Sequence, residues 1–97
     1  MYAVIFRAEL GEFDDHYTAT AARLRQRALE EYGCIEFTAV TEGNMEIAIS
    51  WWEGLEQIQR WKQDPEHVAA QQMGRSKWYK SYTVQVVEIL REYGGGL

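Results

Sequence analysis

A histidine, His67, and a group of aromatic residues around it are the side chains of this sequence best suited to chemistry. Helical spacing after Pro65 brings one set of residues to a single face: His67, Ala70, Gln71, Gly74 and Trp78. A histidine among small residues, with a glycine that allows close approach, predicts the wall of a pocket. The alternatives are a hydrogen-bonded core or helix-face histidine, and a Gly74–Trp78 pair that serves only helix–sheet packing.

The other candidate residues also have interpretations that involve no chemistry. Core packing is the favoured role of Trp61. Trp51 and Trp52 alternate along one strand, so one faces the helices and the other faces the core or a subunit interface. Arg75 either neutralises an acidic group of a substrate or forms a surface ion pair, and the ion pair is favoured. His16, at a helix start, is expected to be solvated.

Several common kinds of site have no support in the sequence. The two histidines, His16 and His67, are far apart, and Cys34 has no second cysteine beside it, so we expect no metal site. A glycine-rich phosphate loop and a Gly-x-Ser-x-Gly nucleophile motif are both absent. Metal, phosphate-loop and serine-nucleophile enzymes therefore lose support.

Composition limits the partners and the compartment. The chain has 97 residues, a net charge of -5 and no basic cluster denser than Arg23, Arg25 and Arg27, so neither nucleic acid nor an anionic membrane is an expected partner. No apolar run approaches the roughly 20 residues of a membrane helix, and the start lacks the features of a signal peptide. A single cysteine favours a reducing, cytoplasmic location. Four tryptophans are many for a chain that buries roughly 65% of its unfolded surface.

Alternation and helical periodicity predict the order β-α-β-β-α-β. The expected strands are 2–9, 35–42, 45–53 and 82–91, and the expected helices are 15–32, 55–62 and 65 to 77 or 79. Gly43-Asn44 predicts a tight hairpin, and Gly33 predicts a helix end. Asp64 and Pro65 predict that the second helical region is broken and restarts there.

This order predicts an α+β fold of the ferredoxin-like type, with four antiparallel strands and helices on one face. Residues 1–93 form the single domain, and the glycine-rich segment 94–97 is expected to be a flexible tail. The other sheet face also carries apolar residues, including Met45 or Trp51. Because a chain of this length has no second layer to cover them, a homodimer is expected.

The sequence resembles the antibiotic biosynthesis monooxygenase family, in a subgroup near the haem-degrading monooxygenases. The resemblance is carried by the segment from Trp52 through Trp61 to Pro65-Glu66-His67, and by Ala70-Gln71, Gly74-Arg75, Trp78-Tyr79 and Tyr82. It implies a dimeric α+β barrel with a pocket between the sheet and the helices.

The resemblance also implies an oxidoreductase that uses O₂ and no cofactor to oxidise a small aromatic molecule, a phenol or quinol. His67 is then the candidate base and Trp61 its aromatic partner. The residues expected to bind the substrate are Trp52, Gln71, Arg75, Trp78 and Tyr79, with Arg75 or Tyr79 stabilising an oxyanion.

Two other functions remain open. In the first, the protein binds or degrades haem, with His67 as the iron ligand. Haem-degrading members carry an asparagine on the first strand, whereas the only asparagine here is Asn44 in the hairpin, which disfavours haem cleavage. In the second, the protein is a non-catalytic dimeric module that binds a ligand, and the aromatic residues serve packing.

Overall fold

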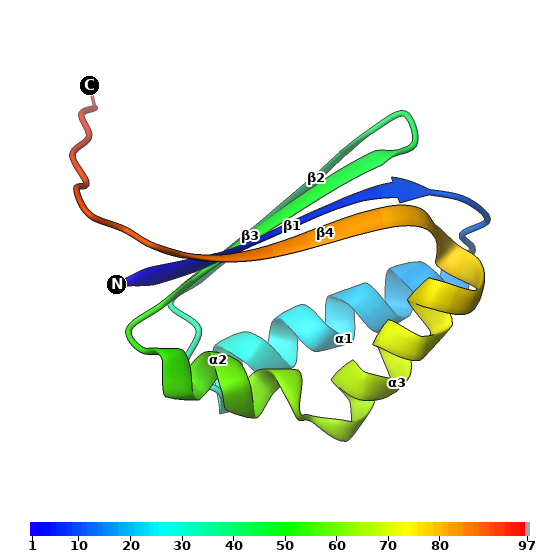
Figure 1. The fold of residues 1–97 in the computed structure, drawn as a ribbon, viewed down its shortest axis with the longest axis horizontal. Helices are drawn as coiled ribbons and strands as arrows, with labels where there is room; N and C mark the ends of the chain where they lie inside the picture. The colour runs from blue at the N-terminus through cyan, green and yellow to red at the C-terminus, as the bar shows by residue number, and fades with distance from the viewer. Residues whose placement is uncertain (97) are drawn as a thin grey trace.

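Four antiparallel strands form one sheet, and three helices cover one of its faces (Figure 1). The computed structural model describes residues 1–96. The elements are β1 (Tyr2–Leu10), α1 (Asp15–Glu31), β2 (Glu36–Glu42), β3 (Met45–Trp52), α2 (Leu55–Lys62), α3 (Pro65–Met73), a π-helical turn η1 (Gly74–Trp78) and β4 (Tyr79–Glu88). The strand order is β2-β3-β1-β4. This confirms the ferredoxin-like fold and the split second helical region.

Local signals in the sequence set most element ends. The Asp14 side chain accepts a hydrogen bond from the backbone N–H of Tyr17 and caps α1. Gly33, with φ of 81°, follows the end of α1. Gly43, with φ of 61°, opens the two-residue turn between β2 and β3. Gly33 and Gly43 lie where the sequence predicts a helix end and a hairpin.

The start of β4 differs from its prediction. The strand begins at Tyr79 and ends at Glu88, three residues before the expected span at each end. Helix α3 ends at Met73, and η1 is the wider turn that follows it. The strand begins directly after η1 because the Trp78 carbonyl accepts a hydrogen bond from the Gly11 N–H and Tyr79 pairs with Leu10 on β1. The periodicity of the local sequence does not predict these long-range contacts.

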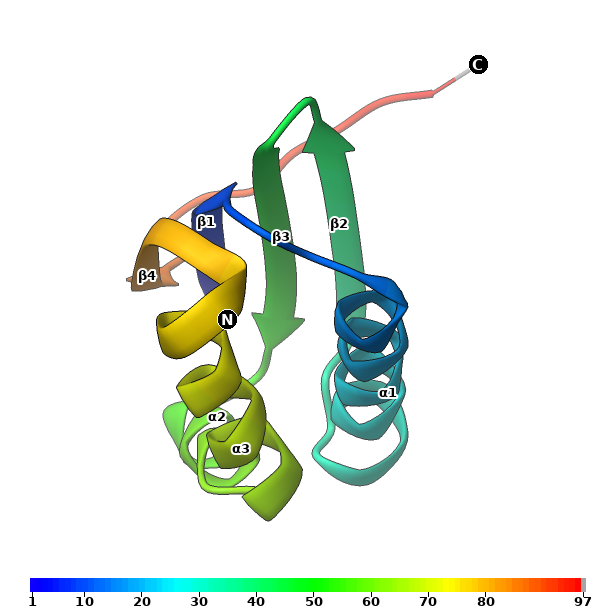
Figure 2. The same ribbon diagram turned by 90° about the vertical axis from the view of Figure 1, so that its right-hand side faces the viewer.

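The core consists of two separate clusters. The first, where α1, α2 and the end of β3 meet, contains Val4, Ala28, Cys34, Trp52, Ile58 and Trp61. The second, where α1 and η1 meet the end of β1, contains Leu10, Tyr17 and Trp78. We call them the junction cluster and the hairpin-end cluster. Figure 2 shows α1 under the β2 side of the sheet and α3 under the β4 side, and this arrangement leaves space between the helices and the sheet.

The opposite face of the sheet is not covered by any element of residues 1–96 (Figure 1). Strand register brings apolar side chains to this outer face, including Ile5, Ile47, Ile49 and Trp51. Trp51 is half-buried there, whereas Trp52 is completely buried on the helix side. The prediction that these two tryptophans face opposite ways is confirmed. No helix within the described chain is long and apolar enough to cross a membrane.

Candidate functional site

A cavity of about 560 Å³ lies between the sheet and the helices. Its volume is in the range of small-molecule sites. All four strands and all three helices contribute to its mainly apolar wall. The polar and aromatic residues of the wall include Arg25, Phe37, Glu46, Trp61, Lys62, His67, Gln71, Arg75, Trp78, Tyr79 and Tyr82.

The His67 ring forms part of the wall near the junction cluster. It stacks on the indole of Trp61, with 4.2 Å between the ring centroids and 26° between the planes. The Nδ1 atom of His67 lies 3.1 Å from the backbone carbonyl oxygen of Trp61. Because a carbonyl oxygen only accepts hydrogen bonds, Nδ1 carries the hydrogen in the neutral ring. Nε2 then holds the free electron pair, which can take up a proton.

Burial changes the protonation of His67. Desolvation lowers the pKa of the imidazole, and this effect outweighs the hydrogen bond to Trp61 and the charge of Asp64, which act in the opposite direction. The ring is therefore neutral at pH 7. A neutral imidazole with an unprotonated Nε2 is the form required of a general base.

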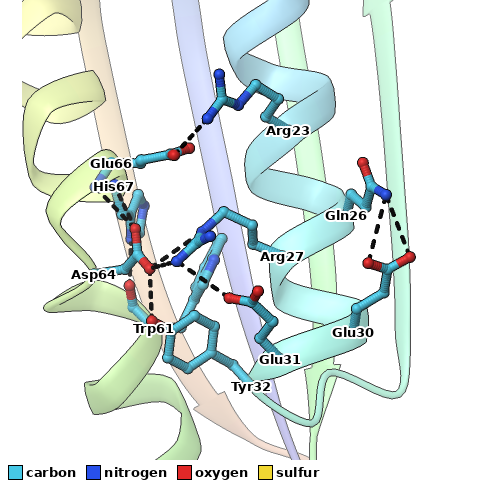
Figure 3. Close-up of polar contacts among 10 residues, drawn as sticks. All are labelled: Arg23, Gln26, Arg27, Glu30, Glu31, Tyr32, Trp61, Asp64, Glu66 and His67. Carbon is cyan, nitrogen blue, oxygen red and sulfur yellow. Dashed lines mark hydrogen bonds and ion pairs between the residues drawn. The ribbon is translucent and has the colours of Figure 1, made fainter.

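A buried carboxylate, Asp64, holds the chain segment that carries His67 (Figure 3). Its Oδ1 caps α3 by accepting hydrogen bonds from the N–H groups of Glu66 (2.8 Å) and His67 (3.3 Å). Its Oδ2 accepts hydrogen bonds from the Arg27 guanidinium and, at 2.6 Å, from the Tyr32 hydroxyl. The Arg27 contact is the main reason that the pKa of Asp64 lies well below its usual range. These contacts join α1 to the junction of α2 and α3.

Trp61 contributes an aromatic wall that is itself supported from behind. Its ring packs on Trp52, with centroids 5.3 Å apart, and edge-on against Phe37. Trp52 is 0% exposed, and its indole N–H donates a hydrogen bond to the Ser50 Oγ at 2.9 Å. In contrast to the prediction that Trp52 contacts a substrate, it lies behind Trp61 and does not line the cavity. Strand alternation indicated its face but not its depth.

The other predicted binding residues, Gln71, Arg75, Trp78 and Tyr79, all line the cavity. The Arg75 Nε donates a hydrogen bond to the Tyr82 hydroxyl at 3.0 Å. Among residues 1–96 Arg75 forms no ion pair, so the favoured expectation of a surface ion pair is wrong. The reason is the position of Arg75 in η1, which directs its side chain to β4 and the cavity.

Gly74 makes room for an aromatic ring. A Cβ atom at this position would overlap the Tyr79 ring. The absence of a side chain at Gly74 therefore allows Tyr79 to lie against η1 and form part of the wall. Burial, with smaller effects from Glu46 and Tyr82, raises the pKa of Tyr79. Its hydroxyl is consequently a neutral hydrogen-bond donor at physiological pH.

Sequence reasoning missed the carboxyl group of the cavity wall, which belongs to Glu46 on β3. Its side chain is 8% exposed, and its Oε2 has no hydrogen-bond partner among the described residues. Desolvation raises the pKa of its carboxyl group. The alternation that places Ala48, Ser50 and Trp52 on the helix side, extended back by two residues, would have identified Glu46.

Within residues 1–96, no group of three His, Cys, Asp or Glu side chains is arranged to hold a metal ion.

Comparisons with known proteins identify relatives of this chain. No family model matches it. The uncharacterized protein YqjZ of Bacillus subtilis (strain 168) is 37% identical over 92 residues, which cover 94% of this chain and 81% of YqjZ.

Many solved structures have a fold similar to that of this chain. The crystal structure of an antibiotic biosynthesis monooxygenase has a TM-score of 0.79 at 12% identity and covers 94% of this chain and 100% of its own. SnoaB from Streptomyces nogalater, a cofactor-independent oxygenase, has a TM-score of 0.77 at 13% identity and covers 94% of each chain. The chain therefore belongs to the same family as YqjZ, and its fold is that of the antibiotic biosynthesis monooxygenases.

Proposed function

We propose that this protein is a monooxygenase that oxidises an aromatic phenol or quinol with O₂ in the cavity, without a cofactor and with His67 as the base. The observation that carries the proposal is the state of His67. It is a neutral imidazole with Nδ1 bonded to the Trp61 carbonyl, and it lies in the wall of an aromatic cavity large enough for a bicyclic or tricyclic molecule. This is the arrangement that proton abstraction from a ring hydroxyl requires.

The reaction begins with proton transfer from the substrate O–H to Nε2 of His67. The resulting phenolate is electron-rich, and its ring carbon reacts with O₂. One oxygen atom becomes a carbonyl oxygen on the ring. The other leaves as water with the two hydrogens that the substrate loses. All four electrons that reduce O₂ come from the substrate, so the balance needs no other reductant.

Other lining residues contribute to binding and charge stabilisation. The indole of Trp61 offers a flat face for a substrate ring and excludes water from it. The Arg75 guanidinium lies on the wall and provides positive charge near a developing oxyanion. Tyr79, kept neutral by burial, donates a hydrogen bond rather than adding a negative charge. SnoaB, which has this fold, is a cofactor-independent oxygenase, and this supports chemistry of the same kind here.

The test uses 1,5-dihydroxynaphthalene, which reacts with one O₂ to give the coloured quinone juglone and one water. An oxygen electrode and the absorbance of juglone should report equal amounts of O₂ consumed and product formed. We expect His67→Ala to lower kcat at least tenfold, because general bases contribute about 10²–10⁴-fold. His16→Ala is the matched control: the chain's other histidine is exposed and does not line the cavity.

An unchanged kcat in His67→Ala would contradict the role of the histidine, and O₂ uptake no faster than in buffer would contradict the oxidation itself. Haem titration into the same proteins tests the haem alternative. A Soret shift lost in His67→Ala would identify His67 as an iron ligand instead. The structure gives haem degradation no further support: Asn44 donates a hydrogen bond to Glu9 in the hairpin region and does not line the cavity.

A further inference from the structure

We propose that Glu46 is a ligand-binding residue that anchors a carbonyl or phenolate oxygen of the aromatic molecule, at the end of the cavity opposite to His67. The inference deepens the function proposed above and rests on it, because it takes this cavity as the place where the aromatic ligand binds. It names the class of ligand more narrowly: an aromatic molecule with an oxygen acceptor at the Glu46 end.

Nothing among the described residues explains the burial of Glu46. Its side chain is more than nine-tenths buried, and its Oε2 has no hydrogen-bond partner among residues 1–96. A buried polar group without a partner destabilises the folded state. Each such group in a folded protein calls for a reason, and an absent ligand is one of them. Because Glu46 lines the cavity, a molecule bound there can supply the missing partner.

The position of Glu46 defines the far end of the cavity. It lies near the start of β3, six residues before Trp52, a span of about 20 Å along a strand. Trp52 packs on Trp61, and Trp61 stacks on His67, so His67 belongs to the other end. The two titratable groups therefore face different parts of one bound molecule.

The charges of the wall indicate which group of a ligand would meet Glu46. It is the only carboxyl among the described lining residues, which also include Arg25, Lys62 and Arg75. These three cations disfavour an ammonium ligand. No ion pair to Glu46 occurs among residues 1–96, and burial raises the pKa of its carboxyl, which favours the acid form. A neutral carboxyl donates a hydrogen bond to an oxygen acceptor.

The residues near Glu46 are also hydrogen-bond donors, and this favours an oxygen acceptor on the ligand. Tyr79 lies close enough to Glu46 that the ionised form of Glu46 contributes to the raised pKa of Tyr79, and its neutral hydroxyl is a donor. Trp78, in the hairpin-end cluster, also lines the cavity, and its indole N–H has no hydrogen-bond acceptor among the described residues. This end of the cavity thus combines the neutral hydroxyl of Tyr79 with two buried polar atoms that have no partner among the described residues, Glu46 Oε2 and Trp78 Nε1.

The experiment compares two probes of matched shape by quenching of tryptophan fluorescence. The first is 2,3-dimethyl-1,4-naphthoquinone and the second is 2,3-dimethylnaphthalene, which lacks the carbonyl oxygens. We expect the wild type to bind the quinone at least tenfold more tightly. Glu46→Leu should weaken quinone binding about tenfold and leave the hydrocarbon unchanged, because one hydrogen bond is lost. Glu46→Gln, whose amide still donates, should keep the preference.

Two further measurements make the outcomes distinct. Glu30→Leu, at an exposed site on α1, is the control for replacing a glutamate with leucine. Thermal unfolding should show that Glu46→Leu is folded and at least as stable as the wild type. If Glu46→Leu keeps the full preference for the quinone, the anchoring role is overturned and the function proposed for the cavity stands. If the wild type binds neither probe, both proposals are overturned.

Discussion

Two effects set the protonation state of the His67 imidazole: a hydrogen bond to a backbone carbonyl, and burial. The Trp61 carbonyl decides which ring nitrogen carries the hydrogen, and burial decides that the ring is uncharged. Neither contact involves a charged partner at the ring itself. Burial has the largest effect on the pKa of His67, and the charges of Asp64 and Lys62 have smaller effects in opposite directions, so the base depends mainly on the backbone and on packing.

The pH dependence of turnover follows from this state. Because burial lowers the pKa of His67 below the unperturbed value of about 6.5, the neutral base persists at and above that pH and is lost as the pH falls through the lowered pKa. We expect kcat/KM for 1,5-dihydroxynaphthalene to be level from pH 6.5 to 8 and to fall only in more acidic buffer. Stopped-time assays over this range measure the profile.

The His67→Ala variant provides the comparison. Its residual rate depends on phenolate formed in solution, so it should rise steadily with pH across the range in which the wild type is level. A wild-type rate that instead rises in parallel with that of the variant would show that His67 does not act as the base.

At the scale of elements, the junction of α2 and α3 is the segment that positions the site. Asp64 caps α3 with one oxygen and binds α1 through Arg27 and Tyr32 with the other. His67 follows three residues later, so its ring direction depends on how α3 begins. A second contact between Arg23 of α1 and Glu66 of α3 supports the same arrangement at the surface (Figure 3).

Removal of the Asp64 carboxylate should therefore destabilise the start of α3 and its packing against α1. We expect Asp64→Ala to lower the free energy of unfolding by about 2 kcal/mol, the upper range for loss of a helix cap. Asp64→Asn should cost less because its amide oxygen can still cap α3. Urea denaturation measures both, with Glu56→Gln, at an exposed position on α2, as the control. Equal stability of Asp64→Ala and the wild type would contradict this role.

The Asp64 carboxylate also makes the free energy of unfolding depend on pH. In the folded state the pKa of Asp64 is depressed, whereas in the unfolded chain it is about 3.9. The contribution of Asp64 is therefore complete above about pH 4 and decreases as the pH falls further. In Asp64→Asn the decrease of stability in acid should be smaller.

For the whole molecule, the outer face of the sheet is an apolar surface that no element of the described chain covers. Met45, Ile47 and Val40 on this face are all exposed. Patches of this kind mark contact surfaces. We therefore expect a homodimer that buries this face, with a mass of about 23 kDa from chains of 11.3 kDa each.

Light scattering after gel filtration measures this mass. Ile47→Glu should yield the monomer, because it puts a charge at the centre of the apolar face. Val68→Glu on α3 is the matched control, since both side chains are 39% exposed in the single chain. A wild-type mass of one chain at micromolar concentration would rule the dimer out.

Local signals made most of the fold predictable, while the site depended on contacts across the molecule. Asp64, Pro65 and Gly43 determine a helix start and a hairpin through their own backbone preferences, so the order of elements follows from the sequence. The early start of β4 depends on pairing of Tyr79 with the distant Leu10. Strand alternation indicates the face on which Glu46 lies but not its burial, because the burial results from the packing of several elements.

The division of the core into two clusters has a consequence for the energetics of the molecule. Most domains complete their interior with their own side chains, but here the space between the junction cluster and the hairpin-end cluster remains open. An aromatic guest of suitable size would bridge the two clusters and act as the missing centre of the interior. Its binding energy would then add directly to folding stability, by about 2.7 kcal/mol at a concentration one hundred times Kd. The molecule would reach its full rigidity only with an aromatic ligand bound in the cavity.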